Sequence, residues 1–188
     1  MTSSNPDACR QIALLRGVNV GRAKRIAMAD LRKLLTDLGY ANVRTLLNSG
    51  NVVFDCPSAG SALSAERIEE ALVVKLGVGA RVTVLNAEQL AHVVAENCLH
   101  EQADDPSRLL VAVLSNPADR DRLAPLVHQQ WQPEAFALGR WAAYLWCPDG
   151  VLASRAAAAM GKLLGDAVTT RNWSTISKLH ALACEPPA

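Results

Sequence analysis

The sequence lacks the local signatures of common catalytic and metal-binding sites. It has no Gly-x-Ser-x-Gly, His-Glu-x-x-His or Walker-type motif, and its four histidines follow no ligand spacing. Its five cysteines are widely scattered, with no Cys-x-x-Cys pair, which predicts reduced thiols in a cytoplasmic protein. We therefore expect no metal and no cofactor. No catalytic residue is assigned, and the sequence leaves open whether the protein is an enzyme.

Long apolar runs are also missing. No stretch approaches the roughly 20 apolar residues that cross a bilayer, and the polar first eight residues predict no signal peptide. We therefore expect no membrane partner and a cytoplasmic location. Half of the 188 residues are hydrophobic, so the chain can bury a full core.

The formal net charge of +1 conceals an uneven distribution. Residues 10–44 carry eight basic and two acidic side chains, residues 55–150 carry seven basic and thirteen acidic ones, and residues 151–184 are again basic. If the two ends meet in space, they form one basic surface. Alternatively, the charges are spread over solvated helix faces, as charge runs usually are.

The order of apolar patterns predicts the fold. Strand-like and helical segments follow one another as β-α-β-β-α-β from Gln11 to Leu85, and after a third helix the pattern β-α-β-β-α repeats. We predict an α+β protein of two ferredoxin-like subdomains with mainly antiparallel sheets. Residues 10–97 form the first subdomain with a connecting helix, residues 107–184 form the second, and together they make one compact unit.

Three polar segments stand out in this predicted fold. The first follows the opening strand, where Gly17 and Gly21 permit a tight turn. The second joins two strands, and the third precedes the last helix, whose dipole favours anions. Backbone N–H groups and arginines of such turns suit a phosphate or carboxylate. The candidate ligand-binding residues are Arg16, Asn19, Lys24, Asn48, Ser49, Asn51, Arg171 and Asn172.

Each segment also has a purely structural explanation. Asn48 to Asn51 is what a tight hairpin requires, and Asn172 is a good helix N-cap without any ligand. Trp173 can simply anchor the last helix. Likewise, Tyr144 and Trp146 could stack on bases, although core packing is their more common use.

Five stretches of this chain carry a resemblance: Ala13–Gly21, Met28–Arg32, Asn42–Thr45, Ser49–Phe54, and Thr169–Trp173 with Lys178 and Leu179. In order and spacing, they resemble one bacterial family, the domain of unknown function 1697. The resemblance implies an α+β fold of two intertwined ferredoxin-like subdomains and implies no activity. One departure is Arg155, where the family usually has lysine, so a role that needs a deprotonatable lysine there is in doubt.

Three functions remain open from the sequence. The first hypothesis is binding of a phosphate-bearing small molecule or nucleotide in a basic pocket shared by the N-terminal turn and the Thr169–Trp173 segment. The second is a nucleic-acid-binding module, and the third is a structural or interaction protein with no ligand site. The sequence does not determine the oligomeric state.

Overall fold

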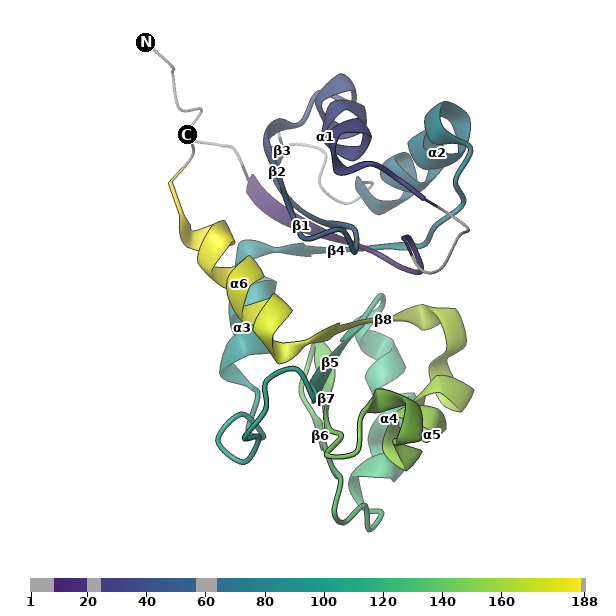
Figure 1. Cartoon of the computed structure of the whole chain (residues 1–188), viewed down its shortest axis with the longest axis vertical. Coiled ribbons are helices and arrows are strands. Elements are labelled where there is room, and N and C mark those ends of the chain that lie inside the picture. The colour runs from purple at the N-terminus through teal and green to yellow at the C-terminus, as the bar shows by residue number, and fades with distance from the viewer. Residues whose placement is uncertain (1–8, 20–24, 57–63, 187–188) are drawn as a thin grey trace. The chain divides into compact units, whose positions relative to one another are not determined.

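The computed structural model describes residues 9–19, 25–56 and 64–186 (Figure 1). The strands are β1 (Cys9–Leu15), β2 (Ala41–Leu46), β3 (Asn51–Cys56), β4 (Val82–Asn86), β5 (Leu109–Leu114), β6 (Ala135–Leu138), β7 (Ala142–Trp146) and β8 (Val168–Asn172). The α-helices are α1 (Met28–Asp37), α2 (Ser64–Leu76), α3 (Ala87–Ala95), α4 (Arg120–Val127), α5 (Arg155–Leu164) and α6 (Trp173–Cys184). Short 3-10 helices cover Pro117–Asp119, Val151–Ala153 and Gly165–Ala167.

The chain forms two compact units. The first unit contains the described residues up to Glu88 and those from Ala181 onward, and the second unit contains Gln89–His180. The chain therefore leaves the first unit to build the second, and its last residues return to the first.

The first unit is a four-stranded antiparallel sheet in the order β2-β3-β1-β4, with α1 and α2 on one face (Figure 1). Alternate residues of β1, including Ala13 and Leu15, join the core under these helices. Ile12 and Leu14 point to the opposite face and are also fully buried. A central strand buried on both faces explains why its sequence is apolar without alternation.

The second unit repeats this arrangement. Its sheet is antiparallel in the order β6-β7-β5-β8, and α4 and α5 lie side by side over it (Figure 1). Both units have the strand order of the β-α-β-β-α-β ferredoxin-like motif. The predicted α+β fold with two ferredoxin-like subdomains is confirmed.

Two local features of the second unit bear on the sequence interpretation. The segment after α5 contains a 3-10 turn followed by β8, which pairs with β5 over five residues. Tyr144 is fully buried and its hydroxyl donates to the Val93 carbonyl at 2.8 Å. It is therefore a core residue, as favoured above, and not part of an open stacking surface.

An ion pair anchors the returning C-terminal segment within the first unit. The Arg10 guanidinium contacts both Asp55 carboxylate oxygens, at 2.8 and 3.2 Å, and donates to the Ala183 carbonyl at 3.1 Å. Asn42 also donates to Asp55, at 2.7 Å. Burial alone would raise the pKa of Asp55, but the hydrogen bonds from Arg10 and Asn42 outweigh it and hold the pKa below its usual value.

Substitution Asp55→Asn is expected to lower the free energy of unfolding by about 2 kcal/mol at neutral pH, because it leaves Arg10 without its charged partner. A carboxyl group with a lowered folded-state pKa stabilises the fold above its unfolded pKa, about 3.9. This contribution is lost as the pH falls through the lowered folded-state pKa. Urea unfolding of parent and variant, from neutral pH downward, should show their difference shrinking in acid.

Asp37→Asn is the matched control. Asp37 lies on the exposed surface of α1 and pairs with Lys33 and Lys75. Exposed pairs of this kind contribute little to stability. Asp37→Asn should therefore lower the free energy of unfolding much less than Asp55→Asn does. Equal losses in the two variants would contradict an anchoring role for Asp55.

Candidate functional site

The turn after β1 is held by backbone contacts and by one amide side chain. The Leu15 N–H donates to the Gly50 carbonyl, and the Arg16 N–H to the Arg81 carbonyl, both at 2.8 Å. Beyond them, Asn19 accepts from the Ile26 N–H at 2.8 Å and donates to the Ile26 carbonyl at 3.0 Å. The same Asn19 amide donates to the Asn48 carbonyl at 2.6 Å. Asn19 thus closes the β1–α1 connection and ties it to the β2–β3 hairpin.

The β2–β3 hairpin turn is built by its own polar residues. Asn51 is fully buried, and its amide donates to the Leu46 carbonyl and to the Ser49 hydroxyl, both at 2.9 Å. Leu47 and Gly50 both have positive φ, of 58° and 74°. A Cβ atom at Gly50 would lie 2.7 Å from side-chain atoms of Leu15 and Val18. Glycine is therefore required both for the backbone angle and for the close approach of this turn to β1.

A pocket of about 500 Å³ opens where this turn meets the start of α1. That volume lies in the usual range for small-molecule sites. Two residues with left-handed backbone, Asn19 and Leu47, lie at the pocket or next to it in the chain, and strained backbone often accompanies a binding site. The pocket is lined by Asn19, Arg25, Ile26, Ala27, Met28 and Asn48.

Helix α1 begins at this pocket, since Ala27 and Met28 both line it. The first hydrogen bond of the helix runs from the Leu31 N–H to the Ala27 carbonyl, at 3.0 Å, so the N–H groups of residues 28 to 30 precede the intrahelical pattern. Ala27 occupies the N-cap position and has no side-chain oxygen to accept from them. In α5 and α6 the same position holds Ser154 and Asn172, which accept from N–H groups of their helices.

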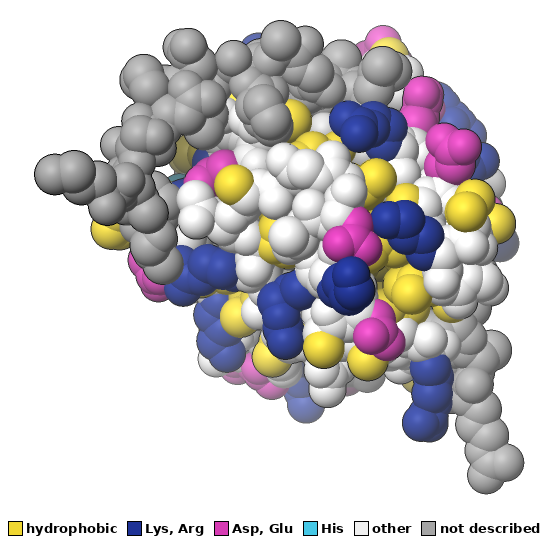
Figure 2. Space-filling model, turned by 90° about the horizontal axis from the view of Figure 1, so that it is seen from above, with side chains coloured by type: hydrophobic (Ala, Val, Ile, Leu, Met, Phe, Trp, Pro, Cys, Tyr) yellow, Lys and Arg dark blue, Asp and Glu magenta, His cyan; other side chains and the backbone are white. Residues whose placement is uncertain are grey.

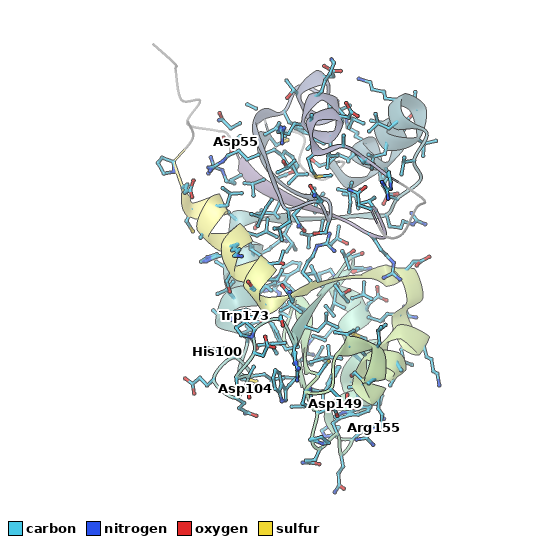
Figure 3. All side chains as sticks on the ribbon, in the orientation of Figure 1. Asp55, His100, Asp104, Asp149, Arg155 and Trp173 are labelled. Carbon is cyan, nitrogen blue, oxygen red and sulfur yellow. The ribbon has the colours of Figure 1, made fainter. Side chains whose placement is uncertain are left out.

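The predicted residues of the third polar segment belong to the second unit. Arg171 lies on β8 and donates to the Thr170 carbonyl at 2.8 Å, and burial lowers its pKa to about 10. Asn172 caps α6 by accepting from the Thr175 N–H at 2.9 Å. Trp173 lies beside His100, with ring centroids 6.2 Å apart (Figure 3).

The candidate residues therefore fall into two groups. The first group lies in the first unit, around the β1–α1 connection and the β2–β3 hairpin, and consists of Arg16, Asn19, Asn48, Ser49 and Asn51. The second group, Arg171 and Asn172, lies in the second unit. A single pocket shared by both ends of the chain stays a prediction. Lys24 lies outside the described residues.

Sequence reasoning missed part of the pocket lining. Arg25, Ala27 and Met28 line the pocket but are not among the candidate residues from the sequence. An available signal was the absence of a capping residue before Met28, because a helix that starts without Ser, Thr, Asp or Asn leaves its first N–H groups to other acceptors.

The second unit has a pocket at the equivalent position, between the start of α4 and the turn of the β6–β7 hairpin. It also measures about 500 Å³ and is lined by Glu96, Arg120, Leu138, Gly139 and Arg140. Arg120 donates to the Gly139 carbonyl at 3.1 Å, and the Arg140 guanidinium lies 5.2 Å from the centre of the Trp141 ring. In both units, basic side chains line this position.

On the α1 and α2 side, basic and acidic side chains of the described residues lie among one another. Figure 2 shows Lys and Arg interspersed with Asp and Glu on this face. Lys33 and Lys75, for example, both pair with Asp37, at 3.1 and 3.6 Å. On this face, the described basic side chains therefore have acidic neighbours.

Metal and membrane features were searched over the described part of the chain. Within residues 9–19, 25–56 and 64–186, no group of three or more His, Cys, Asp or Glu side chains could hold a metal ion. Over the same ranges, no helix combines the length and the apolar character needed to cross a bilayer.

Comparison with known proteins gives a family and a fold. A family model described as "Protein of unknown function (DUF1697)" matches residues 9–144. The structure of the conserved bacterial protein SP0830 from Streptococcus pneumoniae is similar, with a TM-score of 0.76 and 23% sequence identity over 94% of this chain and 99% of that one. No curated protein matches the sequence. At this level of identity the likeness to SP0830 shows the fold alone.

Substitution Gly50→Ala is expected to lower the free energy of unfolding by at least about 2 kcal/mol, because it adds backbone strain and a clash with Leu15 and Val18. Gly39→Ala is the control, since Gly39 also has positive φ but no heavy atom lies within 4 Å of an added Cβ. It should cost only about 1 kcal/mol. Chemical denaturation measures both, and equal costs would show that the close approach at Gly50 does not matter.

Proposed function

The chain belongs to the family described as Protein of unknown function (DUF1697), and because that description names no reaction, we propose a function from the site itself. The first unit binds a phosphate-bearing small molecule, such as a nucleotide or a sugar phosphate, in the pocket between the start of α1 and the β2–β3 hairpin. The observation that carries the proposal is a small-molecule-sized pocket lined both by Arg25 and by a helix N-terminus whose cap residue is alanine.

The chemistry of the pocket favours an anion. Backbone N–H groups at a helix N-terminus and the helix dipole both stabilise negative charge. Arg25 is exposed and carries a planar fork of donors that matches phosphate oxygens. The Asn48 side chain adds polar groups at the rim. Asn19 is a positioning residue in this account, because three hydrogen bonds engage its amide in holding the pocket walls together.

The distribution of charged side chains around the pocket favours a small anionic ligand over a nucleic acid. Binding to a polyanion relies on many basic side chains acting together along an extended surface. On the α1 and α2 side the basic residues alternate with acidic ones (Figure 2). The proposal therefore uses one pocket in the first unit, and it does not depend on Arg171 or Asn172.

Substitution Arg25→Gln is expected to weaken phosphate binding about tenfold or more, as the loss of a hydrogen bond to a charged group does. Thermal unfolding measured with inorganic phosphate, AMP, ATP and glucose 6-phosphate checks this, because a ligand that binds only the folded state raises the melting temperature. Lys162→Gln is the control: it removes one exposed positive charge from the second unit and should leave the shift unchanged. Absence of a shift with all four compounds, or equal shifts in parent and Arg25→Gln, would refute the proposal.

Substitution Ala27→Asp is expected to change stability and binding in opposite directions. An Asp side chain at the N-cap can accept from the N–H groups of the first turn, so the free energy of unfolding should rise by about 1 kcal/mol. The same carboxylate would occupy the anion position and repel phosphate, so the ligand-induced shift should disappear. Ala27→Ser should also stabilise α1 but, being neutral, should weaken phosphate binding less. Undiminished phosphate binding by Ala27→Asp would mean that the α1 N-terminus is not part of the site.

A further inference from the structure

Two cysteines of the first unit face each other across the sheet. Cys9, at the start of β1, and Cys56, at the end of β3, are directly opposite residues in the antiparallel β1–β3 pairing. Both are free thiols in the structure. Because 46 residues separate them in the chain, the sequence gives no sign of this pairing.

The register places both side chains on the same face at a distance that suits a covalent bond. Directly opposite residues of an antiparallel pair have Cα atoms about 4.5 or 5.5 Å apart, and their side chains leave the sheet on the same side. A disulfide requires Cα atoms about 4.4–6.8 Å apart. The β1–β3 pairing is continuous from Cys9 to Leu14, so no bulge displaces the two residues.

The surroundings give the two thiols different access to solvent. Cys9 is partly exposed, whereas Cys56 is 3% exposed and belongs to the core under α1 and α2. An oxidant from solvent therefore reaches Cys9 first, and Cys56 lies within reach as the second thiol. Cys147 is buried in the second unit, and the exposed Cys98 and Cys184 are not on strands.

We propose that Cys9 and Cys56 are a reversible oxidation site that forms a cross-strand disulfide with a peroxide as oxidant. The Cys9 thiolate attacks a peroxide oxygen, the O–O bond breaks, and Cys9 becomes a sulfenic acid while the other oxygen leaves as an alcohol or water. The Cys56 thiolate then attacks the Cys9 sulfur, forming the S–S bond and releasing hydroxide, which takes up a proton to give water. The two thiols lose two electrons and two protons in total, and a dithiol reductant reverses the change by thiol–disulfide exchange.

The proposed disulfide would stabilise the attachment of the C-terminal segment to the first unit. The next pair along the two strands is Arg10 and Asp55, and Arg10 also donates to the Ala183 carbonyl. A disulfide between Cys9 and Cys56 fixes the strand ends that carry this ion pair. Oxidation is therefore expected to protect the C-terminal residues of the first unit from proteolysis.

The test uses the full chain with Cys98→Ser and Cys184→Ser, which retains Cys9, Cys56 and Cys147. Treatment with hydrogen peroxide should lower the thiols titrated after denaturation from three to one, and peptide mass mapping without reductant should show Cys9 joined to Cys56. Dithiothreitol should restore three thiols. Cys9→Ser and Cys56→Ser in the same background serve as controls, and neither should form an intramolecular disulfide.

The melting temperature gives a second readout. The oxidised parent should melt at a higher temperature than the reduced parent, because the cross-link restricts the unfolded chain, whereas neither single-serine control should change on oxidation. Retention of three thiols, oxidation of Cys9 only to sulfinic acid, or a bond that involves Cys147 would overturn the proposal. None of these outcomes depends on phosphate binding, so this inference and the proposed function fail independently.

Discussion

The pairing register between β1 and β3 is the constraint on which the first unit depends. It places Gly50 against Leu15 at one end of the pair, and Arg10 against Asp55 and Cys9 against Cys56 at the other. A slip by one residue would turn every side chain of a strand to the opposite face. Such a slip would remove three features together: the hairpin contact beside the pocket, the ion pair that anchors the C-terminal segment, and the pairing of the two thiols.

The fold was largely predictable because its determinants are periodic and local. Leu31, Leu34 and Leu35 recur at helical spacing and are the buried face of α1, and Gly39 follows that helix with the positive φ expected after a helix C-terminus. The apolar run of β5 indicated a strand buried on both faces, and all six of its residues are buried. Pro125 lies inside α4, where the sequence alone leaves open whether proline opens the helix or kinks it.

The candidate site was less predictable because the same polar residues serve structure. The sequence predicts the amides of Asn19 and Asn51 as ligand-binding groups, yet in the structure both amides donate hydrogen bonds that hold turns in place. The features that give the pocket its chemistry are the exposed Arg25 and an alanine at the N-cap of α1. Neither is unusual as a residue type. These two residues line a pocket only because long-range strand pairing brings the hairpin to the helix. No local sequence pattern predicts that pairing.

The return of the last residues to the first unit bears on how the protein is made. Synthesis proceeds from the N-terminus, and folding domains generally form as their residues emerge from the ribosome. Here the residues up to Glu88 contain the whole first sheet, but Ala183, which accepts from Arg10, is translated only after the entire second unit. The first unit therefore completes these contacts only after the second unit has been translated, and a nascent chain that stalls in the second half carries an Arg10 without this backbone acceptor.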